Sequence, residues 1–326
     1  METLETICRM TQKELFENII KQFPGLCKVK KNKWILVKGN YPVLLVSHLD
    51  TVHTQKVEVI CRSSDGNILM SPQGIGGDDR CGVYALLTIW NNLKSEGIHP
   101  YLLFTCHEEI GGIGAKYFIK SDCINDLKNK LSLIIEIDRK GKDNAVYYDC
   151  DNKGLENYIT SKGFNTQYGS FSDISVIAPA LGIAAVNLSS GYYNAHTQHE
   201  YINVIELENV IEKVEEIICE SKGLPVYEYI EKKYNYNWNF GKTLSPYYSK
   251  VFPGDDILEK YITKYEGDLE KQDMIFGMMD NELEIFDILT DYYNDDDLFK
   301  YIKNCGYDYS VLLDLYNDTV LDNERK

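Results

Sequence analysis

The sequence has no cysteine pair of the CxxC type and no long apolar run. Its nine cysteines are scattered and odd in number, which argues against a cysteine-based zinc finger. Such thiols are typical of a reducing compartment, so we expect a cytoplasmic protein. The N-terminal residues lack a basic stretch followed by an apolar one, and no secretory signal is expected. Without an apolar run of membrane-spanning length, we expect a soluble protein with no membrane partner.

Basic residues are also few relative to acidic ones. The chain has 34 Lys and Arg against 50 Asp and Glu, which gives a formal net charge of −16. A surface with this excess repels phosphate backbones and disfavours a nucleic-acid partner. A metal site would use some of these carboxylates as ligands, and the remainder would keep the protein soluble.

Short β-branched runs alternate with segments of helical periodicity over most of the chain. Predicted strands cover residues 34–37, 43–46, 101–105, 131–137, 145–148 and 183–186, with a hairpin at 57–70. Predicted helices cover residues 3–22, 79–93, 154–161 and 204–219, and another begins at 114–119. Strands that alternate with helices predict an α/β fold, a three-layer α/β/α sandwich with a mostly parallel central sheet.

The composition changes near Pro225, after which Tyr, Asp and Glu become frequent. We therefore predict two domains, residues 1–224 for the α/β sandwich and residues 225–326 for an acidic, Tyr-rich helical C-terminal extension. Helical patterns in the extension cover residues 257–265, 274–293 and 298–305. The acidic triplet at 295–297 is expected to cap a helix rather than to bind a cation.

Five short segments carry His, Asp and Glu in a pattern that suits a metal centre. They read S-H-L-D-T-V (47–52), G-G-D-D-R (76–80), H-E-E-I-G-G-I-G-A (107–115), E-I-D (136–138) and N-A-H-T-Q-H-E-Y-I (194–202). The first four candidate ligands are separated by 30 (78 − 48), 31 (109 − 78) and 29 (138 − 109) residues, each about one βα repeat. Groups that follow parallel strands collect beyond the carboxyl ends of those strands, so these side chains are expected to meet.

Two zinc ions held close together need a shared carboxylate to offset their mutual repulsion, and zinc accepts His nitrogen and carboxylate oxygen. Asp78 suits the bridging role. His48 and Asp138 would complete one ion, and Glu109 and His196 would complete the other. Co²⁺ or Mn²⁺ could use the same ligands.

Two further acids have expected roles that do not involve binding metal. Asp50 would share a strand face with His48, because strand side chains alternate, and would accept its second imidazole N–H. Glu108 would stay unligated and act as the general base, taking a proton from the bridging water and giving it to the leaving amine. Each residue alone has an ordinary interpretation as a capping or solvated acid or a hydrogen-bonded histidine. The combination of these residues in one sequence predicts a two-metal site.

At these motifs the chain resembles the co-catalytic zinc peptidases, in particular the group of peptidase T, aminoacylase, carboxypeptidase G and succinyl-diaminopimelate desuccinylase. The resemblance covers about residues 30–221 and extends to S-F-S-D (170–173) and G-I-A-A-V-N-L (182–188). It implies the same ligands and the same roles for Asp50 and Glu108. Between residues 196 and 200 it places metal on His196, with His199 as a rival ligand and Glu200 helping to hold the loop.

The resemblance implies a dizinc peptidase catalytic domain in residues 1–224, most simply an aminopeptidase or small-peptide hydrolase. Family members usually carry an inserted lid before the last histidine. Only 58 residues (196 − 138) separate the last two ligands here, which leaves room for one or two core elements and no lid. The alternatives are an N-acyl amino acid deacylase or amidohydrolase and, against the presence of Glu108, a non-catalytic metal-binding scaffold. The partner would be a small peptide or N-acyl amino acid, and a homo-oligomer stays open.

Overall fold

A computed structural model describes residues 2–169, 171–232 and 293–304, with scattered positions between 261 and 315. The chain divides into two compact units, Met1–Tyr234 and Asn235–Lys326. In the second unit, α12 (Asp295–Asn304) carries the acidic triplet in its first turn, where the helix dipole favours negative charge. Its buried residues Leu298, Phe299 and Ile302 belong to a separate hydrophobic cluster. The Tyr-rich stretch at 234–238 and most of the other two predicted helices lie outside the described residues.

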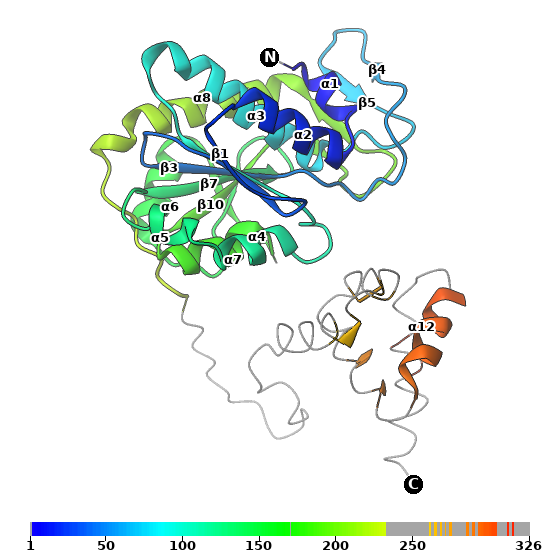
Figure 1. The fold of residues 1–326 in the computed structure, drawn as a ribbon. Helices are drawn as coiled ribbons and strands as arrows, with labels where there is room; N and C mark the ends of the chain where they lie inside the picture. Colours follow the sequence, from blue (N-terminus) through cyan, green and yellow to red (C-terminus); the bar gives the residue numbers. More distant parts are fainter. Residues whose placement is uncertain are drawn as a thin grey trace, which may run out of the picture. The chain divides into compact units, whose positions relative to one another are not determined.

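The first unit is built on an eight-stranded sheet in the order β1-β2-β6-β3-β7-β10-β8-β9 (Figure 1). The strands are β1 Cys27–Lys30, β2 Trp34–Val37, β3 Val43–His48, β6 Tyr101–Thr105, β7 Leu133–Arg139, β8 Asn144–Val146, β9 Asn165–Gln167 and β10 Ala185–Ser189. The central strands β6, β3, β7 and β10 are parallel, whereas β2 and β8 run antiparallel to their central neighbours. Every residue of β3 is buried, as is typical of a strand covered on both faces.

A second, four-stranded antiparallel sheet has the order β11-β12-β5-β4. Its strands are β4 Cys61–Arg62, β5 Ile68–Met70, β11 Tyr192–Tyr193 and β12 Tyr201–Asn203. The predicted hairpin at 57–70 supplies two of these strands. The sheet thus joins the segment before Asp78 to the segment around His196, two parts of the chain that are far apart in sequence.

Helices cover both faces of the large sheet, which confirms the predicted three-layer α/β/α sandwich. Figure 1 shows one layer on each side of the sheet. One layer holds α1 (Leu4–Cys8), α2 (Gln12–Gln22), α3 (Gly77–Leu93) and α8 (Val204–Glu220), and its apolar residues form one cluster. The other layer holds α4 (Ile113–Ile119), α5 (Cys123–Leu127) and α7 (Asp173–Leu181), with a second cluster. The remaining helix, α6 (Lys153–Ser161), is tied to α8, and η1 (Lys94–Glu96) and η2 (Ser221–Gly223) are short 3₁₀ turns.

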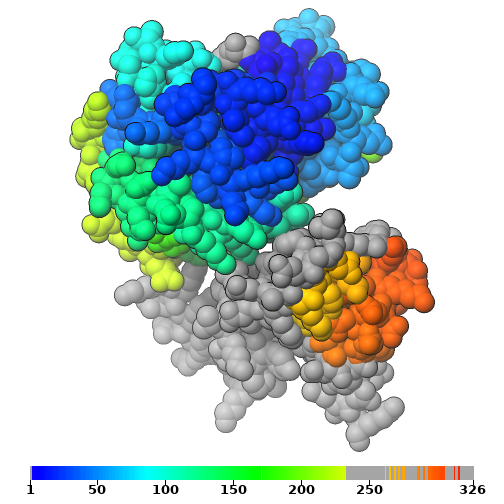
Figure 2. Space-filling view, in the orientation of Figure 1, coloured from blue at the N-terminus to red at the C-terminus, as the bar shows by residue number. Residues whose placement is uncertain are grey.

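The helix predicted at 3–22 is wrong as a single element, because the chain stops at Cys8 and restarts at Gln12. Thr11 begins the second helix with a capping box: its hydroxyl accepts the Glu14 N–H, and the Glu14 carboxylate accepts the Thr11 N–H. On the face shown in Figure 2 these dark blue N-terminal helices lie beside the light blue segment near residues 55–70. Ion pairs of Glu14 with Lys56 and of Glu5 with Arg62 join the two segments.

The first unit continues past residue 224, where the sequence places the domain boundary. Tyr227 donates its backbone N–H to the Ser132 carbonyl and accepts the Ala184 N–H. Further along, Lys232 donates its backbone N–H to the Asp149 carbonyl. Residues 225–232 therefore belong to the sandwich by their hydrogen bonding.

The 58-residue gap before His196 is filled by β8, α6, β9, α7, β10 and β11, more elements than the sequence suggests. All of its strands belong to one of the two sheets. Across the described part of the chain, no helix combines the length and the apolar character that crossing a membrane requires.

Candidate metal centre

The candidate ligands meet at one edge of the large sheet. His48 is the last residue of β3, and Asp138 lies near the end of the neighbouring strand β7. Glu109 follows β6 in a loop, and His196 lies in the loop between β11 and β12. Asp78 enters from a different element, the first turn of α3. Because β3, β6 and β7 are parallel, their carboxyl ends share this edge.

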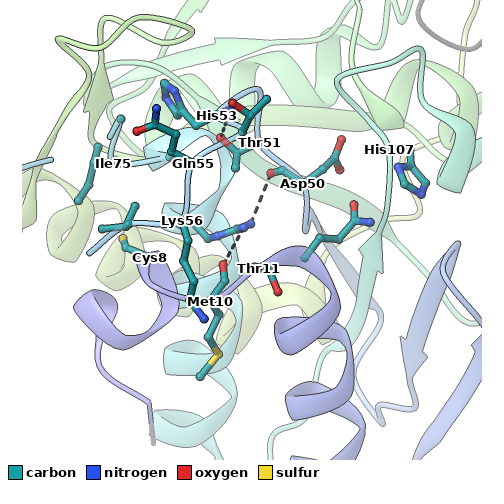
Figure 3. Close-up of a pocket in the computed structure, with 16 residues that line it drawn as sticks. Cys8, Met10, Thr11, Asp50, Thr51, His53, Gln55, Lys56, Ile75 and His107 are labelled. Carbon is teal, nitrogen blue, oxygen red and sulfur yellow. Dashed lines mark hydrogen bonds between the residues drawn. The ribbon is translucent and has the colours of Figure 1, made fainter. Parts of the chain in front are cut away.

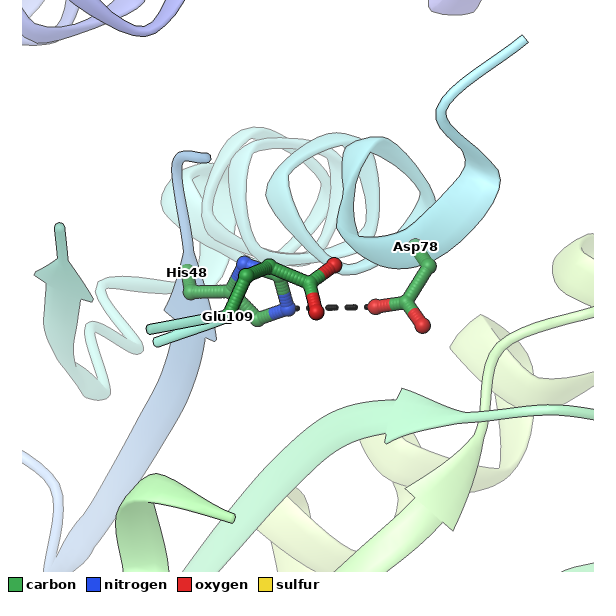
Figure 4. Close-up of side chains that lie close together, drawn as sticks. All are labelled: His48, Asp78 and Glu109. Atoms are coloured by element: carbon green, nitrogen blue, oxygen red, sulfur yellow. Dashed lines mark hydrogen bonds and ion pairs between the residues drawn. The ribbon is translucent and has the colours of Figure 1, made fainter. Parts of the chain in front are cut away.

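The two carboxylate oxygens of Asp78 face two different histidines. Its Oδ1 lies 3.1 Å from His48 Nε2, and its Oδ2 lies 3.3 Å from His196 Nε2. Figure 4 shows Asp78 reaching from the start of α3 toward the His48 ring, with the Glu109 carboxylate beside it. Glu109 Oε2 is 3.1 Å from His196 Nε2. Asp78 thus stands between two groups of donors, as a bridging ligand must.

Asp138 completes the first group, since its Oδ1 lies 3.5 Å from His48 Nε2. Its other oxygen, Oδ2, accepts a hydrogen bond from the Ser172 hydroxyl at 3.3 Å. The backbone on both sides is held as well, because the Asp138 N–H donates to Asn187 Oδ1 and the Tyr192 hydroxyl donates to the Asp138 carbonyl. The carboxylate is therefore fixed with one oxygen aimed at His48.

Asp50 lies behind His48, with Oδ1 3.4 Å from His48 Nδ1. It also accepts the backbone N–H groups of Glu108 and Glu109, each at 3.1 Å. The prediction that Asp50 and His48 lie on one face of a strand is wrong, because β3 ends at His48 and Asp50 lies in the following loop. Arg80 holds that loop by donating to the backbone carbonyl oxygens of Leu49 and Asp50.

The two acids after Gly77 have different environments. Asp79 is fully buried and accepts the backbone N–H groups of His48 and Gly82, so it caps the regular part of α3. The structure brings together two groups of possible metal-binding atoms, one from His48, Asp78 and Glu109 and the other from His48, Asp79 and Asp138. Because the oxygens of Asp79 already accept N–H donors, we regard Asp78 as the better partner of Asp138.

Several buried acceptor oxygens of this cluster have no hydrogen-bond partner, among them Glu109 Oε1 and Asp138 Oδ1. A buried polar atom without a partner is costly, and a cation between these groups would satisfy the acceptor oxygens. The donor set of imidazole nitrogen and carboxylate oxygen is the one that zinc accepts. The residues present therefore fit bound divalent metal.

The negative charge around the histidines favours their cationic form in the absence of metal. Hydrogen bonds with Asp78 and then Glu109 raise the pKa of His196 to about 10. Burial raises the pKa of Asp138, and the nearby Asp78 carboxylate raises it further, to about 7. Burial likewise raises the pKa of Glu108 well above its usual value. These raised pKa values favour bound protons where a metal ion would supply the positive charge instead.

Glu108 also lies close to this cluster, with Oε2 4.0 Å from His48 Nε2. This distance is longer than the 3.1 Å between Glu109 Oε2 and His196 Nε2, so Glu108 is the less suitable of the two as a metal ligand. Neither His196 nor His199 belongs to the two groups of metal-binding atoms found among the described residues, and both are exposed. His196 is the better candidate, because its Nε2 faces Asp78 and Glu109. Cys81 and Cys106, which flank the motifs, are fully buried, and burial raises the pKa of each thiol. They are core residues.

Glu200 helps to hold its own loop through its backbone N–H, which donates to the Thr197 carbonyl. Its carboxylate also holds a second loop, because it accepts the N–H groups of Gly76 and Asp78. Three supporting residues were missed in the sequence. Ser172 and Asn187 lie in the segments quoted for the family resemblance, which could have indicated them. His53, whose Nε2 is 2.8 Å from Glu200 Oε2, carries no motif signal.

Comparison with known proteins bears on the fold. Solved structures of similar fold include a tripeptidase from Staphylococcus aureus, with 16% identity over 68% of this chain and 97% of that chain and a TM-score of 0.53. Aminopeptidase PepT from Bacillus cereus gives 16% identity over 67% and 97%, with a TM-score of 0.52. A TET aminopeptidase from a marine sediment Thaumarchaeota archaeon gives 14% over 66% and 95%, with a TM-score of 0.53.

At these identities the structural likeness establishes the fold. None of the curated proteins matches the chain in sequence. The sequence profile of peptidase family M28, however, matches residues 34–238, well over half of the chain. The chain therefore belongs to peptidase family M28 and is a metal-dependent peptidase, as its motifs imply.

Proposed function

We propose that this peptidase is a two-zinc aminopeptidase or small-peptide hydrolase. The observation that carries the proposal is the position of Asp78, with one oxygen toward His48 and the other toward His196. A single-metal site has no use for this arrangement. The three structures of similar fold named above are a tripeptidase and two aminopeptidases, and we extend that activity to this chain as part of the proposal.

In this proposal Asp78 is the shared ligand of both ions. His48 and Asp138 would complete one site, which lies among fully or largely buried side chains. Glu109 and His196 would complete the other, where the His196 side chain is about half exposed. The exposed site would thus be the one that substrate reaches first. Zinc is proposed as the metal because His and carboxylate donors suit it, although Co²⁺ and Mn²⁺ accept the same set.

The chain's own residues would then move the proton. Bound metal ions lower the pKa of water and polarise the scissile carbonyl. Glu108 would take a proton from the attacking water and return it to the leaving amine, and its burial, by raising its pKa, suits a group that must both accept and donate. Asp50 would keep His48 in the tautomer that presents Nε2, while its bonds to two backbone N–H groups fix the loop that carries Glu108.

An N-acyl amino acid deacylase with the same centre is the alternative, because the residues around the reacting atoms are common to both reactions. The two reactions differ in what lies on the amino side of the scissile bond. A free α-amine there identifies an aminopeptidase substrate, and an acyl group identifies a deacylase substrate.

The eight described cysteines are all free, which supports a reducing, cytoplasmic location.

One substrate panel tests the function. The number of bound metal ions per chain is measured in the full-length protein. The protein and its Glu108→Ala variant are then each assayed with trialanine, N-acetyl-trialanine, alanyl anilide and N-acetyl-alanine. Cleavage of the free-amine substrates alone supports the aminopeptidase, and acetate release from N-acetyl-alanine supports the deacylase. Fewer than one metal ion per chain, or hydrolysis that Glu108→Ala leaves undiminished, would refute the mechanism.

A further inference from the structure

A buried carboxylate lies beneath the turn that presents Asp78. Glu200 is fully buried and is the residue just before β12. Its Oε1 accepts the Asp78 backbone N–H at 3.0 Å, and its Oε2 accepts the Gly76 N–H at 2.9 Å. Asp78 has φ −83° and ψ 101°, outside the helical region. Glu200 thus supplies the acceptor for a backbone N–H at a residue without helical geometry.

His53 provides a third contact to the same carboxylate, with Nε2 2.8 Å from Glu200 Oε2. The His53 ring lies against Gly74, where an added Cβ would be 2.2 Å from the ring Nδ1. Only glycine fits at that position. The backbone N–H of His53 also points to the Thr51 hydroxyl at 3.4 Å. The ring is therefore held between the loop after β3 and the loop before α3.

His53 is also one wall of a cavity of about 340 Å³ next to the metal centre. Figure 3 shows it beside Thr51, with Asp50 further along the same cavity. Gly76, whose N–H is bound by Glu200, lines the cavity too. His53 thus connects this cavity to the turn that carries Asp78.

We propose that His53 and Glu200 form a positioning pair that fixes the backbone of Asp78, so that its two oxygens can face two metal ions. The pair acts through Asp78 and does not touch substrate or metal. This inference rests on the proposed two-metal function. Hydrogen bonds to a buried carboxylate are stronger than neutral ones, and losing one donor leaves an unmatched charge. A small rotation at Asp78 would move one oxygen away from its histidine.

The substitutions His53→Phe, His53→Gln and Glu200→Gln separate positioning from a purely structural role. Phe keeps the ring and removes the donor, whereas Gln restores an N–H donor. Glu200→Gln replaces one carboxylate oxygen by an amide nitrogen, which cannot accept a backbone N–H. The matched control is His99→Phe, because His99 precedes β6, at the opposite end of that strand from Glu108, and stacks on Trp90.

The readouts are the affinity for Co²⁺ or Zn²⁺ in chelator competition, the Co²⁺ absorption spectrum, the melting temperature, and kcat and KM separately. We expect His53→Phe and Glu200→Gln to bind the pair of ions about 10- to 100-fold more weakly, with an altered Co²⁺ spectrum, lower kcat and little change in KM. His53→Gln should recover most of the affinity, and His99→Phe should match the wild type.

Wild-type affinity, spectrum and kcat in both His53→Phe and Glu200→Gln would overturn the positioning role, even if their melting temperatures fall. If Glu200→Gln does not fold, the comparison of His53→Phe with His53→Gln decides the question. Two bound ions and peptide cleavage in the wild type, with no effect of these variants, would leave the proposed function intact. A wild type without bound metal or hydrolysis would overturn both.

Discussion

His48 and Asp78 face each other across 3.1 Å, Nε2 to Oδ1, although 30 residues separate them in the chain. The His48 side chain is fully buried, whereas that of Asp78 is 13% exposed. Burial alone would raise the pKa of Asp78, but hydrogen bonds with His196 and His48 lower it well below its usual value. Asp78 is thus an anion at neutral pH with its charge shared between two imidazoles.

The first prediction concerns this shared carboxylate. Asp78→Asn replaces one of its two oxygens by an amide nitrogen, which cannot bind a metal ion. We expect bound zinc to fall from two ions per chain to one or none, with the remaining affinity at least about 10-fold weaker. Metal analysis after dialysis checks this. Asp126→Asn is the control, because Asp126 forms an exposed ion pair with Lys28 and should leave metal content unchanged. Two tightly bound ions in Asp78→Asn would exclude bridging.

Adjacent glutamates give the second prediction. Glu108→Gln should keep both metal ions and lose about 10²- to 10⁴-fold in kcat, because it removes a proton carrier and no ligand. Glu109→Gln should instead lose metal, since Glu109 Oε2 faces His196 at 3.1 Å. The two variants are isosteric neighbours in one loop, so each is the control for the other. Equal metal loss in both would show that the roles are not divided as proposed.

Asp50 is the subject of the third prediction. Asp50→Asn keeps the side-chain volume but replaces one acceptor oxygen by an amide donor, which would face a backbone N–H or the His48 ring. We expect metal affinity to fall about 10- to 100-fold. Because the same carboxylate holds the loop of Glu108 and Glu109, kcat should fall in the metal-saturated variant as well. Full recovery of kcat at saturating metal would limit Asp50 to orienting His48.

The candidate site could be predicted from the sequence because its residues lie in short motifs, and the structure brings these residues together. The four central strands could be predicted from apolar, β-branched runs, since nearly all of their residues are buried in the sheet. The even spacing of the ligands had a different origin from the one inferred. The segment between His48 and Asp78 is not a βα repeat but an excursion through β4 and β5 of the small sheet. Asp78 therefore lies at the start of a helix rather than after a strand.

The elements that were missed are short and polar or depend on tertiary contacts. Strand β9 is three exposed residues, and β11 has two residues, so neither gives a periodic pattern. His53 carries no local signal, because its partner Glu200 lies 147 residues away. The break between α1 and α2 was readable in principle, since Thr11 and Glu14 have the spacing of a capping box.

The fourth prediction follows from the raised pKa of His196. With a pKa of about 10 in the metal-free protein, this imidazole carries a proton at pH 7, and it must lose that proton to bind metal. Metal affinity should therefore rise with pH, by about tenfold per pH unit for each proton released, until the pH approaches 10. Chelator competition with Co²⁺ at pH 6.5, 7.5 and 8.5 measures the slope. An affinity independent of pH would mean that His196 is neutral without metal or is not a ligand.

The fifth prediction concerns where the peptidase domain ends. Residues 225–232 make five backbone hydrogen bonds to the rest of the first unit, two of them through Tyr227, which is 7% exposed. A chain ending at residue 234 keeps these contacts, and one ending at residue 224 loses them. At about 1 kcal/mol for each bond and about 2 kcal/mol for the buried tyrosine, the shorter chain should be about 7 kcal/mol less stable.

Urea unfolding of the two truncated chains, followed by circular dichroism, measures this difference. The longer chain should bind metal like the full-length protein, because every proposed ligand precedes residue 225 and the ion pairs that join the ligands involve no later residue. Equal stability of the two chains would place the domain boundary at residue 224, as the composition suggests. A longer chain that binds metal normally but has lost peptide hydrolysis would instead assign the second unit a part in binding substrate, separate from the metal chemistry.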